Sequence, residues 1–210
     1  MSMWTGTNKA KGGGFFGARD SLGPLFLTLA PPVVSMVLVH ANTVHKGDLG
    51  ATVTEIMEEP AAFIDSAFAA PSWEGVKVIL TYIALELVLM RAAPGFWHQG
   101  PVSPSGHRPM YLDNAFQHFC IALVGFIGGA ALGFWELSVF MDHYRDIVIF
   151  MNGASLVFCL FLYFKGIYAP STADNSTTGN FFVDYYWGTE LYPRILGWDV
   201  KQFTNCRFGM

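Results

Sequence analysis

The chain has 210 residues, a formal net charge of −4 and an apolar composition, with 52% hydrophobic and 13% charged residues. Soluble domains carry about 25% charged residues, so this composition argues against an ordinary soluble domain. The charge also lacks the basic excess that nucleic-acid binding needs, so we expect no nucleic-acid partner. Cys120, Cys159 and Cys206 form no metal-binding spacing, and an odd number of cysteines cannot close a disulfide framework. We predict no metal site.

The first 20 residues, Met1–Asp20, are rich in glycine and weakly basic, with Lys9, Lys11 and Arg19 and no apolar run. We expect a disordered tail. The apolar segment that follows has no convincing cleavage site, so we interpret it as retained rather than removed as a signal peptide. Residues 21–210 are then predicted to belong to one transmembrane domain.

Four apolar segments come close to the roughly 20 residues that cross a bilayer as a helix. They are Ser21–Val39, Val76–Ala93, Ala115–Trp135 and Ile147–Phe164. The first contains Pro31-Pro32, which predicts a kink. The final residues, Cys206–Met210, resemble the first turn of a fifth span. The predicted fold class is all-α: a polytopic membrane helical bundle of about four complete transmembrane helices and the start of a fifth.

An acidic side chain, Glu86, lies inside the second of these segments. Lys77 and Arg91 near its ends can extend to the headgroups, whereas Glu86 is about two turns inside. A membrane-embedded acid indicates a functional site by default. The structural alternative is a glutamate that is paired within the bundle. The sequence leaves both open. We interpret His118, near the start of the third segment, as a histidine satisfied within the bundle.

The connecting segments differ in character. His45–Glu74 is a polar, acidic connection in which Ala61–Ala70 is a candidate interfacial helix. Pro94–Asn114 is rich in proline and glycine, which predicts a structured loop rather than a helix. Glu136–Asp146 is predicted to be a short loop.

Glycines recur every four residues in the third segment, at Gly125, Gly129 and Gly133. Such a stripe of small residues lets another helix approach closely. Helix packing explains the pattern.

The distribution of Lys and Arg predicts the orientation. Nine lie in the N-terminal tail, in the loop around Pro94–Asn114 and after the fourth apolar segment, and the other three of the 12 lie on the opposite face. The positive-inside rule then places the N-terminus and this loop in the cytosol.

One stretch, Gly179–Arg194, combines acids, arginine and aromatic residues: GNFFVDYYWGTELYPR. A belt of interfacial aromatics does not require acids to alternate with Gly188 and Pro193. We interpret the stretch as a folded loop in which acids and arginines pair. It can close one end of a cavity for a flat apolar ligand, or approach a phosphate-bearing cofactor. No GxGxxG motif follows a strand, so no Rossmann site is visible.

This stretch resembles the signature segment of the sterol reductases, which include sterol C14 reductases, the lamin B receptor and Δ7-sterol reductases. It departs from the pattern at Phe182-Val183, where an aliphatic residue followed by Tyr or His is usual. Upstream, GPVSPSGHRPMY at Gly100–Tyr111 resembles the family's GPxxPxGxRPxY loop. Tyr192 and the ending TNCRFGM look like plant-type Δ7-sterol (7-dehydrocholesterol) reductases. The matching signature-loop positions are Gly179, Asp184, Gly188, Leu191, Pro193 and Arg194.

The resemblance implies a membrane enzyme of about ten helices in the endoplasmic reticulum. It implies NADPH-dependent reduction of the C7–C8 double bond of a 5,7-diene sterol. The expected partners are the sterol, the bilayer and other membrane enzymes of sterol biosynthesis. In this family most NADPH contacts lie in the C-terminal half, so these 210 residues are expected to be the N-terminal portion and to be inactive alone.

The chemistry narrows the candidate site residues. An isolated alkene resists hydride until it is protonated, so the catalyst needs an acid in a water-poor pocket. Our candidates for proton donation or site shaping are Glu86, Asp184 and Glu190. Our candidates for cofactor binding are Arg194, Lys201 and Arg207.

Two alternatives remain. A sterol C14 reductase is the first, although Tyr192 and Asn205-Cys206-Arg207 speak against it. A non-catalytic membrane protein that binds sterol or acts as a scaffold is the second. The sequence does not separate them.

Overall fold

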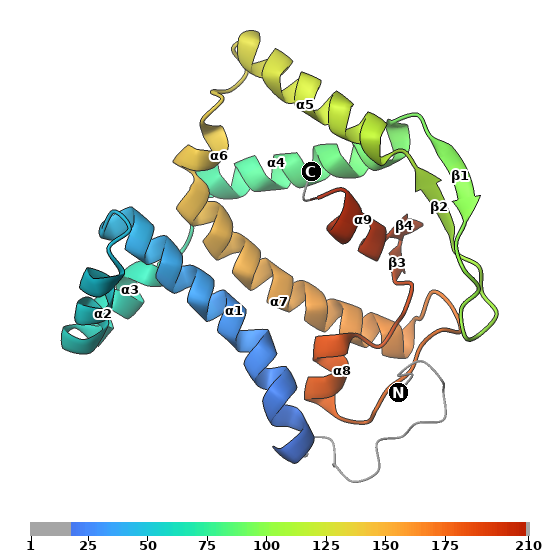
Figure 1. Ribbon diagram of the computed structural model, residues 1–210, viewed down its shortest axis with the longest axis horizontal. Helices are drawn as coiled ribbons and strands as arrows, with labels where there is room; N and C mark the ends of the chain where they lie inside the picture. The colour runs from blue at the N-terminus through green and yellow to red at the C-terminus, as the bar shows by residue number, and fades with distance from the viewer. Residues whose placement is uncertain (1–17, 209–210) are drawn as a thin grey trace.

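A computed structural model describes residues 18–208 of the chain (Figure 1). Most of the predicted disordered tail lies outside this range, but residues 18–20 form the first turn of a helix rather than a tail. The fold is mostly helical. The helices are α1 Ala18–Val44, α2 Leu49–Glu58, α3 Pro60–Ala67, α4 Trp73–Ala92, α5 Ala115–Ala131, α6 Val139–Asp142, α7 Tyr144–Tyr168, α8 Phe181–Trp187 and α9 Val200–Cys206.

Two antiparallel hairpins interrupt the helices, which the all-α prediction missed. The strands are β1 Phe96–Gln99, β2 Met110–Asp113, β3 Arg194–Ile195 and β4 Trp198–Asp199. In the first hairpin Phe96 pairs with Asp113 and Gln99 with Met110. The surrounding prolines and glycines correctly indicated that no helix forms here, but they gave no sign of the two four-residue strands, of which β1 is exposed and β2 is partly buried.

Among the described residues, two helices are long and apolar enough to cross a membrane. They are Asp20–Val44, with a mean hydropathy of 2.0, and Tyr144–Tyr168, with 2.2. The rest of the chain buries little of either helix, unlike the core helix of a soluble protein. The first continues without a break through Pro31-Pro32, so the helix is longer than the predicted span.

The other two expected spans are too short or too charged to count as membrane-crossing helices by length and composition. Helix α4 has 20 residues but includes Glu74 and Lys77 as well as Glu86 and Arg91. Helix α5 has 17 residues and ends at Ala131, not at the predicted Trp135. Sequence analysis therefore located these helices but overstated the apolar length of the third segment.

The end of α5 explains this difference. Gly133 has a positive φ of 79°, which turns the backbone out of the helix. Trp135 then folds back, and its Nε1 donates to the carbonyl of Phe126 at 3.0 Å. A methyl group added at Gly129 would lie 2.1 Å from the Trp135 ring. The glycine therefore makes room for this tryptophan side chain, and not for a neighbouring helix as predicted. At Gly125 such a group would contact no described atom, and the predicted helix-packing stripe is not used between the described helices.

Two connections between the apolar segments contain helices, of which only α3 was anticipated, as the candidate interfacial helix Ala61–Ala70. Residues 45–74 hold α2 and α3; the Asp48 side chain caps α2 by accepting from the Ala51 N–H at 3.0 Å, and Pro60 begins α3. Residues 136–146 hold α6 and the first turn of α7. Side-chain capping and proline at a first helical position are local signals that the polar composition masked.

The helices are arranged around α7, which crosses the middle of the molecule (Figure 1). Helix α1 packs against α7 and α8, and α4 packs against α7 and α5. The two hairpins and α9 lie at one side, and α2 and α3 lie at the other.

The predicted start of a fifth span is wrong for Cys206–Phe208. Helix α9 ends at Cys206, where the N–H groups of Arg207 and Phe208 both donate to the Phe203 carbonyl, at 3.0 and 2.9 Å. The Arg207 side chain, 2% exposed, donates to the Leu112 carbonyl at 3.1 Å. Residues 209–210 of the predicted turn lie outside the described range.

Candidate functional site

The signature segment begins with a capped helix. The Asn180 side chain accepts hydrogen bonds from the N–H groups of Phe182 and Val183, at 3.0 and 3.3 Å, and so caps α8. Its amide nitrogen donates to the Ser21 hydroxyl at 3.0 Å. These bonds attach the segment to the first turns of α1. Gly188, with a φ of 79°, ends the helix.

Asp184 organises the loop that precedes α8. Its buried carboxylate accepts from the N–H and the hydroxyl of Thr178, at 2.8 and 2.7 Å, and from the Thr177 hydroxyl. The donors are loop groups and not a guanidinium. The expected pairing of this acid with an arginine is therefore wrong.

Glu190 attaches the segment to the end of α7. Its buried carboxylate accepts from Lys165 Nζ at 2.7 Å and from the Ser171 N–H. Next to it, a methyl group on Gly166 would lie 2.1 Å from the Thr189 hydroxyl oxygen, so only glycine permits this approach. The acid pairs with a lysine and a backbone donor rather than with the predicted arginine.

Asp174 joins the two family-like motifs and was missed in the sequence. Its carboxylate accepts from the Ser105 N–H at 3.0 Å, and its carbonyl accepts from the Leu191 N–H at 2.9 Å. The rings of His107 and Tyr192 also approach, with centroids 5.6 Å apart. The loop 100–111 therefore lies against the signature segment. The signal available in the sequence was only a lone aspartate in a polar stretch.

The environment of Asp174 favours its charged form. Burial raises the pKa of this carboxyl, but hydrogen bonds from Ser103 and Ser105 outweigh burial and hold the pKa below its ordinary value of 3.8. The charge on the carboxylate is part of what holds the two motifs together.

A cavity of about 250 Å³ lies between the end of α4, the first hairpin and the second hairpin with α9. Two of its lining residues have a buried polar atom without a hydrogen-bond partner among residues 18–208: Nε of Arg194 and Oδ2 of Asp199. Buried polar groups are nearly always satisfied, by protein or by water, so the two unpaired atoms mark this lining as a candidate binding site. The lining residues are Met90, Arg91, Trp97, Met110, Leu112, Arg194, Gly197, Asp199 and Gln202.

The second hairpin sets the rim of this cavity. Leu196 and Gly197 both have positive φ, 49° and 82°, as a tight two-residue hairpin turn requires. The turn presents the Gly197 carbonyl to Arg91, which donates to it at 2.6 Å, and the same guanidinium lies 4.7 Å from the centre of the Trp198 ring. With Arg194, this gives the cavity two positive charges against the one carboxylate of Asp199.

Glu86 and His118 form a buried hydrogen-bonded pair between α4 and α5. They are 3% and 0% exposed, and Nε2 of His118 contacts Oε2 of Glu86. Of the two interpretations that the sequence left open for Glu86, this contact corresponds to a glutamate paired within the bundle. Nδ1 of His118 has no hydrogen-bond partner among the described residues. Met90, a cavity-lining residue, lies four residues beyond Glu86 on α4, about 6 Å along the axis.

The first of these helices is also connected to the end of the chain. The Asn114 amide donates to the carbonyls of Met90 and Ala93, at 3.1 and 2.9 Å, and its oxygen accepts from Arg207 at 2.8 Å. Arg207, predicted to bind cofactor, therefore supports the wall of the cavity. The structure does not bring the three candidate acids together. Each lies in its own hydrogen-bond network, while Arg194 lines the cavity and Lys201 is exposed on α9.

Comparison with known proteins identifies the family of this chain. Residues 25–210 match the Ergosterol biosynthesis ERG4/ERG24 family. The chain belongs to this family. It is 36% identical over 186 residues to a 7-dehydrocholesterol reductase of Arabidopsis thaliana, covering 88% of this chain and 43% of that protein. It is 30% identical over 188 residues to a Delta(14)-sterol reductase of Methylotuvimicrobium alcaliphilum, covering 89% and 42%.

A vertebrate relative shows the same coverage. The chain is 26% identical over 202 residues to the 7-dehydrocholesterol reductase of Xenopus laevis, covering 89% of this chain and 43% of that protein. The chain thus spans less than half the length of these ERG4/ERG24 relatives. The matched range contains all the candidate acids and arginines named above.

We predict that Asp174→Asn lowers the thermal unfolding midpoint at about pH 6 and makes it less sensitive to acid. A carboxyl whose pKa is lower in the folded than in the unfolded state stabilises the fold above its unfolded pKa, and this contribution disappears as pH falls through the folded value. The wild-type midpoint should therefore fall more steeply than that of the variant below about pH 4. Asp65→Asn, at an exposed position, is the control. Parallel acid profiles for wild type and Asp174→Asn would contradict the prediction.

Proposed function

We propose that the chain is the N-terminal part of a sterol reductase that uses NADPH to reduce the C7–C8 double bond of a 5,7-diene sterol. The observation that carries this proposal is the family match across residues 25–210. The higher identity to the Arabidopsis 7-dehydrocholesterol reductase favours the Δ7 over the Δ14 reaction. Reduction of the C14–C15 double bond of a sterol is the second candidate, because the Delta(14)-sterol reductase aligns over about the same share of the chain.

We propose that α4 and α5 cross the membrane together with α1 and α7. Pairing with His118 removes the Glu86 charge from contact with lipid, which makes α4 acceptable as a span. Helix α5 is shorter than the roughly 20 residues of an ideal span, and local bilayer thinning accommodates such a mismatch at modest cost. The distribution of basic residues supports a cytosolic N-terminus. The proposed reaction supports a location in the endoplasmic reticulum. We propose that residues 21–210 belong to one transmembrane domain.

Protonation of the sterol requires an acid that can release a proton. Asp184 and Glu190 are each fixed by several donors of the signature loop, so we propose that they shape the loop. Glu86 instead shares a buried contact with a histidine, a pair that can hold and pass a proton. We propose Glu86 as the proton donor, with His118 as the group that returns the proton to it.

The cavity fits one end of a nucleotide cofactor and not the whole. At about 250 Å³ it is smaller than the roughly 300–1,000 Å³ of typical ligand pockets. Arg194 and Asp199 both line the cavity, where a guanidinium can bind a phosphate and a carboxylate can accept from a ribose hydroxyl. When bound, NADPH supplies the hydride. We propose that these two residues hold its sugar-phosphate end, that the remainder binds outside this cavity, and that Lys201 adds positive charge nearby.

The substrate assignment is tested with membranes that contain the protein encoded by the complete gene. With NADPH, we expect loss of the 5,7-diene of 7-dehydrocholesterol to exceed reduction of a Δ14 sterol by at least tenfold. The 210-residue chain, assayed in parallel, should have no activity. A preference for the Δ14 sterol would identify the second candidate. If neither sterol reacts, the chain belongs to a non-catalytic sterol-binding or scaffold protein.

The proposed proton donor is tested with Glu86→Gln in the same complete protein. Since a general acid contributes roughly 10²- to 10⁴-fold, turnover should fall at least about 100-fold while the KM values for sterol and NADPH change little. The glutamine can still accept a hydrogen bond from His118. Glu74→Gln, at the exposed start of the same helix, should retain turnover. Normal turnover in Glu86→Gln would exclude Glu86 as the proton donor and leave Asp184 and Glu190 as the candidates.

The cofactor contact is tested with Arg194→Lys. Lysine keeps the charge but loses the Nε donor and the planar fork, so we expect the KM for NADPH to rise about tenfold or more, with little change in turnover at saturation. The KM for sterol should not change. Arg108→Lys, an exposed position on the neighbouring loop, is the control. A rise in the sterol KM alone would place the sterol, and not the cofactor, in this cavity.

A further inference from the structure

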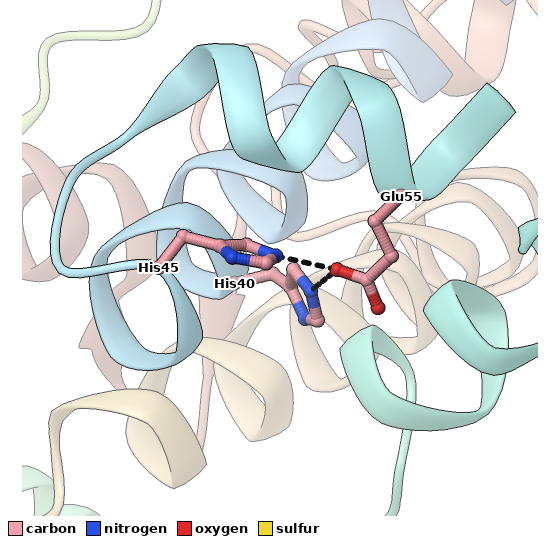
Figure 2. Close-up of side chains that lie close together, drawn as sticks. All are labelled: His40, His45 and Glu55. Carbon is pink, nitrogen blue, oxygen red and sulfur yellow. Dashed lines mark hydrogen bonds and ion pairs between the residues drawn. The ribbon is translucent and has the colours of Figure 1, made fainter. Parts of the chain in front are cut away.

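A cluster of two histidines and a glutamate lies where α1 turns into α2 (Figure 2). Helices α1 and α2 meet on the opposite side of the molecule from the two hairpins and α9 (Figure 1). His40 is near the end of α1, His45 follows its last residue, and Glu55 lies on α2. Glu55 Oε2 is 2.8 Å from Nε2 of His40 and 2.5 Å from Nε2 of His45. One ligand atom from each residue lies within 4.8 Å of the other two.

The backbone turn brings the second histidine back over the first. After α1, the N–H groups of His45 and Gly47 both donate to the Ala41 carbonyl, at 3.1 and 2.9 Å. Lys46 and Gly47 have positive φ, 54° and 91°, which reverses the chain within a few residues. The two imidazole rings then lie 5.5 Å apart. Sequence analysis missed this cluster because a five-residue separation places two histidines together only after such a reversal.

We propose that His40, His45 and Glu55 bind a zinc ion. Two imidazole nitrogens and one carboxylate oxygen form a donor set that zinc takes in proteins, with a water molecule in the fourth position. At bond lengths of about 2.0–2.1 Å, ligand atoms around tetrahedral zinc lie roughly 3.3 Å apart. The two contacts of Glu55, at 2.8 and 2.5 Å, are shorter than this by less than about 1 Å, and a glutamate side chain that is 20% exposed can withdraw by that much. All three ligand atoms already lie within 4.8 Å of one another.

The surroundings support the ligands in a fixed orientation. The His40 side chain is 2% exposed and meets Phe63 edge to face, with ring centroids 5.0 Å apart. When Nε2 binds zinc, Nδ1 carries the ring hydrogen, and this atom lies 3.5 Å from the Ser66 hydroxyl. The Ser66 carbonyl in turn accepts from Arg145 on α7 at 2.8 Å. Hydrogen bonds of this kind to the second ring nitrogen orient metal-bound histidines.

The site would act as a clamp. It links the end of the first membrane helix to α2, and the Ser66 contact extends the link to α3 and α7. Three protein ligands leave one coordination position open to water or to an exchangeable ligand. This proposal goes beyond the reductase activity and does not depend on it.

The test is zinc binding by the 210-residue chain, purified in detergent with a tag that contains no histidine. Equilibrium dialysis followed by elemental analysis should find about one zinc per chain. Glu55→Gln and His45→Ala should each weaken binding more than the roughly 10- to 100-fold that loss of a supporting hydrogen bond costs. Cobalt should give the visible absorption of a tetrahedral site in the wild type and lose it in both variants.

Matched controls use the same residue types outside the cluster. Glu58→Gln changes an exposed glutamate on the same helix, and His98→Ala changes an exposed histidine on β1; both should bind zinc as the wild type does. Helix content by circular dichroism shows whether each variant is folded. Unchanged zinc affinity in a folded Glu55→Gln or His45→Ala, or no zinc on the wild type, would overturn the proposal and leave a hydrogen-bonded cluster.

Discussion

The position of the signature segment depends on the buried contact between Glu190 and Lys165. The two charges lie 2.7 Å apart, and a backbone N–H also donates to the carboxylate, so the buried charge is paired and hydrogen-bonded. Without such partners a buried carboxylate would be costly, and removal of one partner of a buried pair is strongly destabilising. Because Gly166 lets Thr189 approach α7 directly, the contact fixes the segment against the long apolar helix.

The cavity follows from this attachment. Once the segment is fixed to α7, Arg194 reaches the first hairpin, where it donates to the Met110 carbonyl at 3.3 Å. Arg207 approaches the same hairpin and Asn114, and Asn114 holds the last carbonyls of α4. The walls are thus hydrogen-bonded to one another, and Arg194 and Asp199, each with one unpaired buried atom, both line the space between them.

Sequence reasoning was most successful where the signal was local. Long uncharged runs located α1 and α7, the proline and glycine content excluded a helix around Pro94–Asn114, and the motif residues identified the family. It failed where a partner comes from elsewhere in the chain. The pairing of Glu190 with a lysine, the role of Asp174 between two loops and the return of Trp135 onto Gly129 all join residues by contacts that composition does not encode.

The sequence by itself determined that this is an apolar, mostly helical protein of the ERG4/ERG24 family, because hydrophobic run length and motif spacing are properties of consecutive residues. Tertiary structure alone decided which donors each acid meets, since hydrogen-bond partners depend on distance in space. It showed that Asp184 and Glu190 hold a loop, that Glu86 meets His118, and that Arg207 supports a wall. Among the candidate arginines, it placed Arg194 at the cavity.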